Sequence, residues 1–147
     1  MKEECKKRFC VRVLGCKVNQ YEAGRIERLL ESMGLVSANA GETADIAVLH
    51  GCAVTAPAAR KSRQTLRRLR GDYPQAVLIM SGCSAAMEGF SAEAEGCLAA
   101  PAGPNWAQQL RRCVNEALGQ TPAQTDTTIP GLERFPGHKR AFLNIQD

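Results

Sequence analysis

The sequence predicts an α/β domain of three layers, built on a mainly parallel sheet of about four strands. Three short apolar runs support this prediction: residues 9–14 (FCVRVL), 46–50 (IAVLH) and 76–81 (AVLIMS). Runs of this length and composition that end in glycine are typical of buried strands. Each run is followed directly by Gly-Cys, and the three cysteines lie 36 and 31 residues apart. Each interval matches one strand–helix–strand unit of roughly 30 residues.

A helix is expected between the first strand, residues 9–14, and the second, residues 45–50. Apolar residues recur at helical spacing between positions 26 and 33. Asn19 is expected to cap this helix at its start, and Gly34 is expected to end it, because these residue types favour those positions.

A second helix is expected between the second strand and the third, residues 76–81. Thr55 is its expected cap, Pro57 suits its first turn, and the residues Gly-Asp-Tyr-Pro at 71–74 are expected to end it. A short helix or turn is predicted over residues 84–90.

The last part of the predicted domain is a brief fourth strand at residues 97–100, a Pro/Gly turn at 101–104 and a final helix. Asn105 is the expected cap of this helix and Gly119 its expected end. Trp106 and Cys113 lie on the helix and are interpreted as packing residues. This order of elements is that of a flavodoxin-like domain.

The composition changes after residue 119. Residues 120–139 are rich in Thr, Pro and Gly and are interpreted as a linker, and residues 140–147 begin with a strand-like run. A single strand with no partner after it is not an independent unit. We therefore expect a domain at residues 1–119, a linker at 120–139 and, at 140–147, the start of a second, truncated domain.

The overall composition is typical of a globular protein, with 44% hydrophobic and 23% charged residues in 147. No run of about 18 apolar residues is present, which argues against a membrane span. The charged start of the chain does not have the apolar core of a signal peptide. A cytoplasmic, reducing location is expected, where the seven cysteines would be free thiols or metal ligands.

Positive charge is concentrated in the second predicted helix. Six Lys and Arg residues occur within residues 60–70, which contain no acidic residue. On a helix, one stripe consists of Arg60, Arg63, Arg67 and Arg70, and the adjoining buried face consists of Ala59, Ser62, Leu66 and Leu69. The stripe is either a weak contact for nucleic-acid phosphates or an ordinary solvated face.

The three Gly-Cys pairs are the strongest candidates for a functional site. Parallel strands point the same way, so Cys16, Cys52 and Cys83 are expected at one edge of the sheet, where open α/β sheets bind ligands. Three thiols at that edge indicate a metal or iron–sulfur centre, with three merely buried thiols as the alternative. No C-x-x-C occurs, which disfavours a zinc knuckle or a thioredoxin-type motif.

Four ordered motifs carry a resemblance to a known family. They are residues 15–22 (GCKVNQYE), 52–55 (CAVT), 60–64 (RKSRQ) and 82–83 (GC). Over residues 9–118 the chain resembles the amino-terminal domain of the radical S-adenosylmethionine methylthiotransferases. The first motif is similar to the branch that modifies threonylcarbamoyladenosine next to the tRNA anticodon, and a sister branch that acts on isopentenyladenosine is the alternative.

The resemblance implies that Cys16, Cys52 and Cys83 bind an auxiliary 4Fe-4S cluster. It also implies that S-adenosylmethionine and a second 4Fe-4S cluster bind in a further domain through a C-x-x-x-C-x-x-C motif, which this sequence does not contain. The chain by itself is therefore expected not to turn over. Its expected partner is tRNA, bound through the full-length protein, with weak direct contact through the arginine stripe.

The chain departs from the family pattern at a few positions. His50-Gly51 replaces the usual Asn-Thr, and Ser84 and Ala86 replace an aromatic residue and a Gln. Residues 96–105 also diverge. His50 either bonds to cluster sulfur or is an ordinary residue at a strand end. Other functions also stay open: a metal- or nucleotide-binding regulatory domain, although no phosphate-binding glycine loop is present, or an inert domain.

Overall fold

The computed structural model describes residues 5–15, 17–51, 55–86 and 96–120. The described elements are β1 (Arg8–Val13), α1 (Lys17–Ser32), β2 (Val36–Ser37), β3 (Ile46–His50), α2 (Ala56–Asp72), β4 (Val77–Gly82), η1 (Cys83–Ala86), β5 (Leu98–Pro101) and α3 (Trp106–Leu118). The expected linker, apart from residue 120, and the expected final strand lie outside the described residues.

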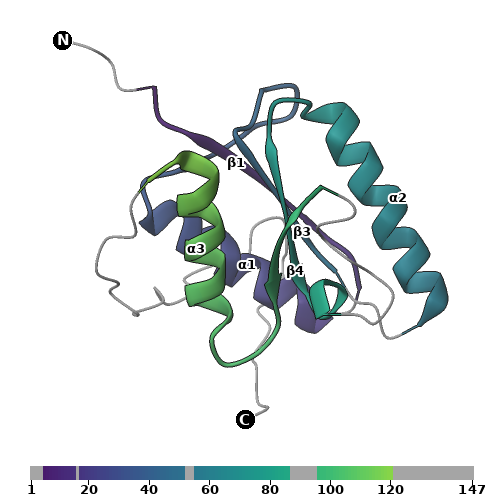
Figure 1. Ribbon diagram of the computed structural model, residues 1–147. Coiled ribbons are helices and arrows are strands. Elements are labelled where there is room, and N and C mark those ends of the chain that lie inside the picture. The colour runs from purple at the N-terminus through teal and green to yellow at the C-terminus, as the bar shows by residue number, and fades with distance from the viewer. Residues whose placement is uncertain (1–4, 16, 52–54, 87–95, 121–147) are drawn as a thin grey trace.

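The elements form a parallel α/β sheet with the strand order β2-β1-β3-β4-β5 (Figure 1). The predicted α/β class and parallel sheet are confirmed, but the sheet has five strands where about four were expected. The additional strand is β2, which pairs with the start of β1 through Arg8–Val36 and Phe9–Ser37. Its two residues are both exposed, so it has no apolar pattern that could have revealed it.

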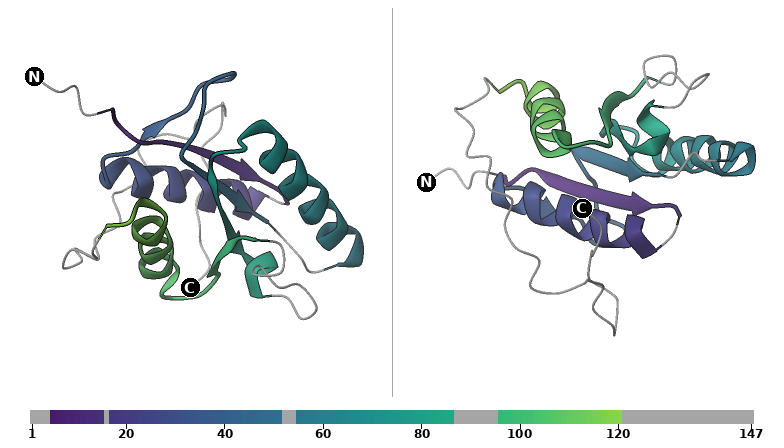
Figure 2. Two further views of the ribbon diagram at one scale, coloured as in Figure 1. Left: turned by 45° about the horizontal axis from the view of Figure 1, so that its top comes forward. Right: turned by 90° about the horizontal axis from the view of Figure 1, so that it is seen from below.

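Helices cover both faces of the sheet. In Figure 1 and in the left view of Figure 2, α2 lies on the opposite side of the strands from α1 and α3. Alternate residues of β3 supply the two cores: Ile46 and Val48 pack with α1 and α3, and Ala47 and Leu49 pack with α2. All of β3 is buried because it is the central strand.

Apolar periodicity predicted the buried face of α2 correctly. The buried residues of this helix are Ala59, Ser62, Leu66 and Leu69. Thr55 caps the helix as predicted, because its side chain accepts a hydrogen bond of 3.3 Å from the backbone N–H of Ala58. Gly119 ends α3 as predicted, in the left-handed conformation with φ 64°.

Two of the other predicted caps differ in the structure. Asn19 does not cap α1, because the helix already begins at Lys17; instead its side-chain amide donates 2.8 Å to the carbonyl of Leu14. This bond ties the first turn of the helix to the end of the β1 segment. Asn105 occupies the cap position of α3 but forms no capping hydrogen bond through its side chain. Among the described residues, no helix is both long and apolar enough to cross a membrane.

Candidate functional site

The three Gly-Cys pairs follow three adjacent strands of the sheet. In the sheet register, Val13 of β1 pairs with His50 of β3, which pairs with Ser81 of β4. Gly51 and Gly82 come directly after the latter two residues, and Gly15 comes two residues after Val13. The three glycines that precede the predicted ligands therefore lie side by side at the carboxyl edge of the sheet.

Backbone hydrogen bonds hold these strand ends together. The N–H of Leu14 donates 2.9 Å to the carbonyl of His50, and the N–H of Gly51 donates 3.1 Å to the carbonyl of Ser81. The N–H of Ala102 donates 3.4 Å to the carbonyl of Gly82 on the other side. The sheet thus remains paired up to the residues that precede the cysteines.

Gly82 allows the ends of β3 and β4 to approach very closely. Its φ is +85°, a conformation that residues with a side chain rarely adopt. A Cβ at this position would lie 2.8 Å from the carbonyl oxygen of Gly51 and 2.9 Å from Cε1 of His50. The glycine before Cys83 is therefore required both by its backbone conformation and by its neighbours.

The structure describes one of the three predicted ligands. Cys83 begins the short helix η1 and has an exposed, free thiol. Cys16 and Cys52 lie outside the described residues. Within the described ranges, no three Cys, His, Asp or Glu side chains form a group that could hold a metal ion.

Among the remaining cysteines, the two on or near the final strand and helix are buried. The thiol of Cys113 donates 3.4 Å to the carbonyl of Ala99, and burial raises its pKa, which keeps the thiol neutral. Cys97 is also buried, while Cys10 is half-buried and Cys5 is exposed. The environment of Cys113 agrees with its interpretation as a packing residue.

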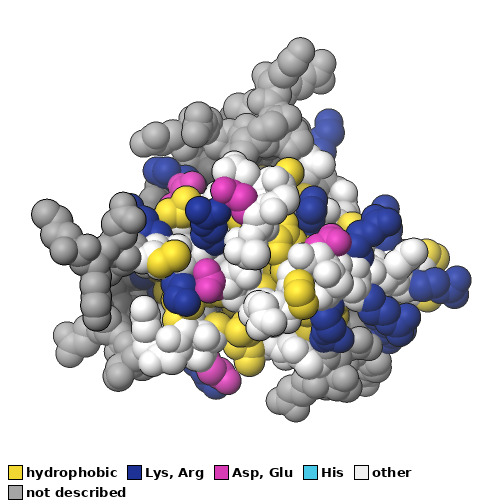
Figure 3. All heavy atoms as spheres, turned by 90° about the horizontal axis from the view of Figure 1, so that it is seen from above, with side chains coloured by type: hydrophobic (Ala, Val, Ile, Leu, Met, Phe, Trp, Pro, Cys, Tyr) yellow, Lys and Arg dark blue, Asp and Glu magenta, His cyan; other side chains and the backbone are white. Residues whose placement is uncertain are grey.

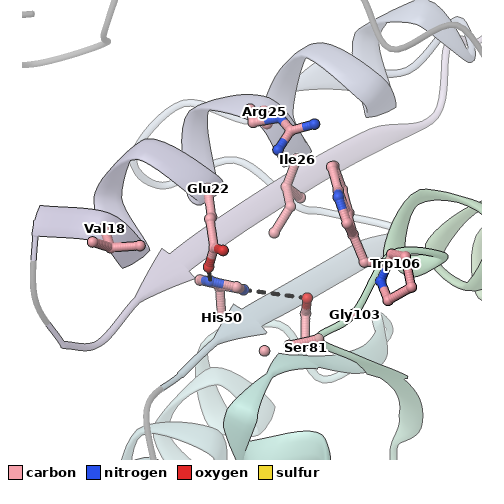
Figure 4. Close-up of a pocket in the computed structure, with 11 residues that line it drawn as sticks. Val18, Glu22, Arg25, Ile26, His50, Ser81, Gly103 and Trp106 are labelled. Atoms are coloured by element: carbon pink, nitrogen blue, oxygen red, sulfur yellow. Dashed lines mark hydrogen bonds and ion pairs between the residues drawn. The ribbon is translucent and has the colours of Figure 1, made fainter. Parts of the chain in front are cut away.

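Behind the strand ends, three polar side chains from three elements form a hydrogen-bonded chain. Nε2 of His50 lies 2.8 Å from Oε2 of Glu22 on α1, and Nδ1 lies 3.2 Å from the hydroxyl of Ser81 on β4 (Figure 4). His50 and Ser81 are only 4% and 3% exposed. These hydrogen bonds link α1, β3 and β4 next to the strand ends that precede the cysteines.

The charge of Glu22 sets the direction of these hydrogen bonds. The hydrogen bond from His50 holds the pKa of the Glu22 carboxyl below its usual value, although partial burial acts in the opposite direction. An ionised carboxylate only accepts, so Nε2 of His50 donates to it. In the neutral imidazole, Nδ1 then accepts from Ser81. Because both ring nitrogens are engaged within the protein, the structure supports the strand-end interpretation of His50 rather than a bond to cluster sulfur.

The same side chains line a cavity of about 470 Å³ at the carboxyl edge. Five segments surround it: α1, the end of β3, the end of β4, the loop after β5, and the start of α3 (Figure 4). Its wall residues are Val18, Glu22, Arg25, Ile26, His50, Ser81, Gly82, Ala102, Gly103, Pro104 and Trp106. Sequence reasoning missed this cavity. Trp106, expected to pack, does pack against the core but also forms part of the cavity wall.

The arginine stripe of α2 is only partly free on the surface. Arg60, Arg67 and Arg70 are exposed, whereas Arg63 is half-buried. The guanidinium of Arg70 lies 4.0 Å from the sulfur of Cys97. Figure 3 shows Lys and Arg side chains gathered over the end of the molecule where α2 lies. Because Arg70 already contacts Cys97, the best-placed phosphate contacts among the exposed arginines of the stripe are Arg60 and Arg67.

Comparison with known proteins adds an independent observation. A family model described as "Uncharacterized protein family UPF0004" matches residues 8–103, which include all three Gly-Cys pairs. The chain belongs to this family. The matched region contains every described strand and ends in the loop before α3.

Curated relatives have names that describe tRNA methylthiotransferases. A tRNA-2-methylthio-N(6)-dimethylallyladenosine synthase of Photorhabdus laumondii is 28% identical over 134 residues, which is 88% of this chain and 28% of that protein. A threonylcarbamoyladenosine tRNA methylthiotransferase of Chlamydia pneumoniae is 30% identical over 149 residues, 98% of this chain and 33% of that protein. One with the same enzyme name from Bacillus subtilis is 40% identical over 72 residues, 49% of this chain and 16% of that protein.

These relatives confirm the resemblance to the methylthiotransferases that the four motifs indicated. The chain spans about a third or less of the relatives described here. Their names refer to two different modified adenosines, one with a threonylcarbamoyl group and one with a dimethylallyl group. Similarity alone therefore supports the reaction class and leaves the substrate branch open.

Proposed function

We propose that this chain is the auxiliary iron–sulfur domain of a tRNA methylthiotransferase, with Cys16, Cys52 and Cys83 as the ligands of a 4Fe-4S cluster. The observation that carries this proposal is the position of the three Gly-Cys pairs, which follow three adjacent parallel strands at one edge. Neighbouring strands are about 4.8 Å apart, so the ends of three adjacent strands are close enough for cysteines that follow them to converge on one small cluster.

The residues at this edge fit the chemistry of such a cluster. Thiolates are its usual ligands, and three of them leave one iron with an open position. The exposed thiol of Cys83 is accessible at the edge. Helix α1 begins directly after Cys16, and α2 begins four residues after Cys52. The positive ends of these helices favour thiolate over thiol.

The parent enzyme would add a methylthio group to the adenine of threonylcarbamoyladenosine next to the anticodon. The cluster, when bound, supplies sulfur, while S-adenosylmethionine and a second 4Fe-4S cluster would bind in a further domain of the parent protein. The part played by this chain's own residues is to hold the three thiolates in place through the paired strand ends. The chain by itself is expected not to turn over. The choice of branch depends on the motif at residues 15–22 and is part of the proposal.

The proposal includes tRNA as partner and a cytoplasmic location. Arg60 and Arg67 are exposed and lie on the same side of α2. Contacts between arginine and phosphate weaken as salt displaces them, so a stripe with few exposed charges supports only weak binding. Strong tRNA binding would require the rest of the parent protein.

Anaerobic reconstitution with iron and sulfide tests the ligand assignment. We expect about four irons per chain and the visible absorption of a 4Fe-4S cluster. Cys16→Ser, Cys52→Ser and Cys83→Ser should each lower the iron content sharply, because two thiolates hold a cubane poorly. Two variants are matched controls: Cys5→Ser removes another exposed thiol, and Cys97→Ser removes a buried one.

The outcome separates this function from its alternatives. If the three ligand variants load as much iron as the parent chain, the assignment is wrong, and a regulatory or inert α/β domain becomes the better description. If Cys5→Ser or Cys97→Ser also loses iron, the binding is not specific to the sheet edge.

A further inference from the structure

The cavity of about 470 Å³ lies next to the proposed cluster site but uses none of its ligands. Val18 is two residues after Cys16, His50 is two residues before Cys52, and Gly82 precedes Cys83. Its volume is within the range of small-molecule sites, about 300–1,000 Å³. If a substrate atom reacts at the cluster, a neighbouring part of the same substrate could therefore occupy this cavity.

The cavity contains two opposite charges on one helix face. Glu22 and Arg25 are three residues apart on α1, so their side chains leave the helix on the same side. The guanidinium carbon of Arg25 lies 5.0 Å from the centroid of the Trp106 ring. Within the described part of the chain, Arg25 forms no ion pair with a carboxylate. Its charge is positioned by the indole and also acts on the nearby Glu22 carboxylate, whose pKa it helps to lower, but with no direct ion pair it can still bind an anionic ligand.

The remaining wall residues indicate which other groups a ligand of this cavity would carry. Val18, Ile26 and Pro104 provide apolar surface, and Trp106 provides a flat ring. One carboxylate oxygen of Glu22 is bound by His50, and the second can accept from an N–H group. A fitting group carries an anion at one end, N–H donors nearby and a compact apolar part.

We propose that this cavity receives the N6 substituent of the target adenosine and that Arg25 selects threonylcarbamoyl by binding its threonine carboxylate. The proposal rests on the proposed function and names the residue that decides between its two substrate branches. A threonylcarbamoyl group has the required carboxylate, urea N–H groups and a methyl group. A dimethylallyl group has no polar atom, and placing it here would remove water from Glu22 and Arg25 without replacing their hydrogen bonds.

The chain contains a single tryptophan, and it lines this cavity. Its fluorescence therefore reports on the cavity directly. The 147-residue chain is titrated with the nucleoside N6-threonylcarbamoyladenosine and, separately, with N6-dimethylallyladenosine. We expect a saturable change in Trp106 emission with the first nucleoside and at least tenfold weaker binding of the second. Calorimetry measures the same affinities without depending on the indole.

Variants of Arg25 test the role of its charge. Arg25→Gln should weaken the binding of the threonylcarbamoyl nucleoside by about tenfold or more, as expected for the loss of one charge-assisted hydrogen bond. Arg25→Lys should retain part of the affinity. The control is Arg112→Gln, which removes an exposed arginine of α3 and should leave both affinities unchanged. Circular dichroism and thermal unfolding of each variant verify that it is folded.

Four results would overturn the proposal: no binding of the threonylcarbamoyl nucleoside, equal binding of both nucleosides, preference for the dimethylallyl nucleoside, or full affinity in a folded Arg25→Gln variant. Measuring the iron loading of the same preparations distinguishes a wrong role for Arg25 from a wrong cluster assignment. If the cysteine variants lose iron as expected while nucleoside selection is absent, the cluster assignment stands and the role of Arg25 is wrong.

Discussion

Gly82→Ala is expected to disturb the edge of the sheet where β3 and β4 meet. Two effects combine at this position. The backbone has φ +85°, and the new Cβ would lie 2.8 Å from the carbonyl oxygen of Gly51. Since that oxygen belongs to the backbone, it cannot move aside as the end of a flexible side chain would.

Other glycines of the chain separate the two effects. Gly34 has nearly the same φ, +86°, but nothing lies within 4 Å of the added Cβ. Gly34→Ala should therefore show the conformational cost alone, about 1–2 kcal/mol. Gly82→Ala adds an overpacking cost of about 1–3 kcal/mol. Gly71, in α2, has an ordinary φ and open space, so Gly71→Ala should stabilise the chain by up to about 1 kcal/mol.

Urea unfolding of the reduced, metal-free parent chain and of the three variants measures their free energies of unfolding. We expect the order Gly71→Ala, parent chain, Gly34→Ala and Gly82→Ala, from most to least stable. Iron loading after reconstitution should fall in Gly82→Ala and remain unchanged in Gly34→Ala. If Gly82→Ala is no less stable than Gly34→Ala, the close approach of the two strand ends does not constrain this position and the reasoning is refuted.

The remaining predictions concern charge and turnover. Asp45 accepts 2.9 Å from the backbone N–H of Arg8, and this hydrogen bond lowers the pKa of its carboxyl. Its contribution to stability is therefore present above about pH 4 and is lost as the pH falls through the lowered pKa, so the stability difference from Asp45→Asn, measured by urea unfolding, should shrink on acidification. Replacing both Arg60 and Arg67 by Gln should weaken tRNA binding and reduce its salt slope by about 1 per arginine in filter-binding assays, with Arg112→Gln as control; an unchanged slope would exclude α2 as a phosphate contact. Mass spectrometry of tRNA nucleosides should detect no methylthiolated product after incubation with this chain alone, and product formation would contradict the proposed need for a further domain.

Local features of the fold followed from the sequence because they depend on near neighbours. The spacing of Ala59, Ser62, Leu66 and Leu69 defined the buried face of α2 through helical geometry alone. Thr55 capped that helix because its hydroxyl needs only to reach an N–H three residues ahead. Short apolar runs that ended in glycine located the three central strands and indicated that their Gly-Cys pairs share one edge.

Features that depend on distant contacts required the tertiary structure. Asn19 left the cap position because a carbonyl five residues earlier, in the strand end, was available to its amide. The strand β2 consists of two exposed residues that pair with the edge of β1, a pairing that no local pattern indicates.

The candidate site divides in the same way. Its cysteines were apparent because each follows its own strand in a repeated local pattern. The hydrogen bonds of His50 join it to Glu22, 28 positions earlier, and to Ser81, 31 positions later. The cavity beside these side chains is also lined by Arg25 of α1 and Trp106 of α3. No sequence period relates these residues. The sequence by itself determined the three central strands and the edge at which the glycines before their cysteines lie. The packing of α1 and α3 across the sheet decided which polar side chains meet beside that edge, because only folding brings those distant segments into contact.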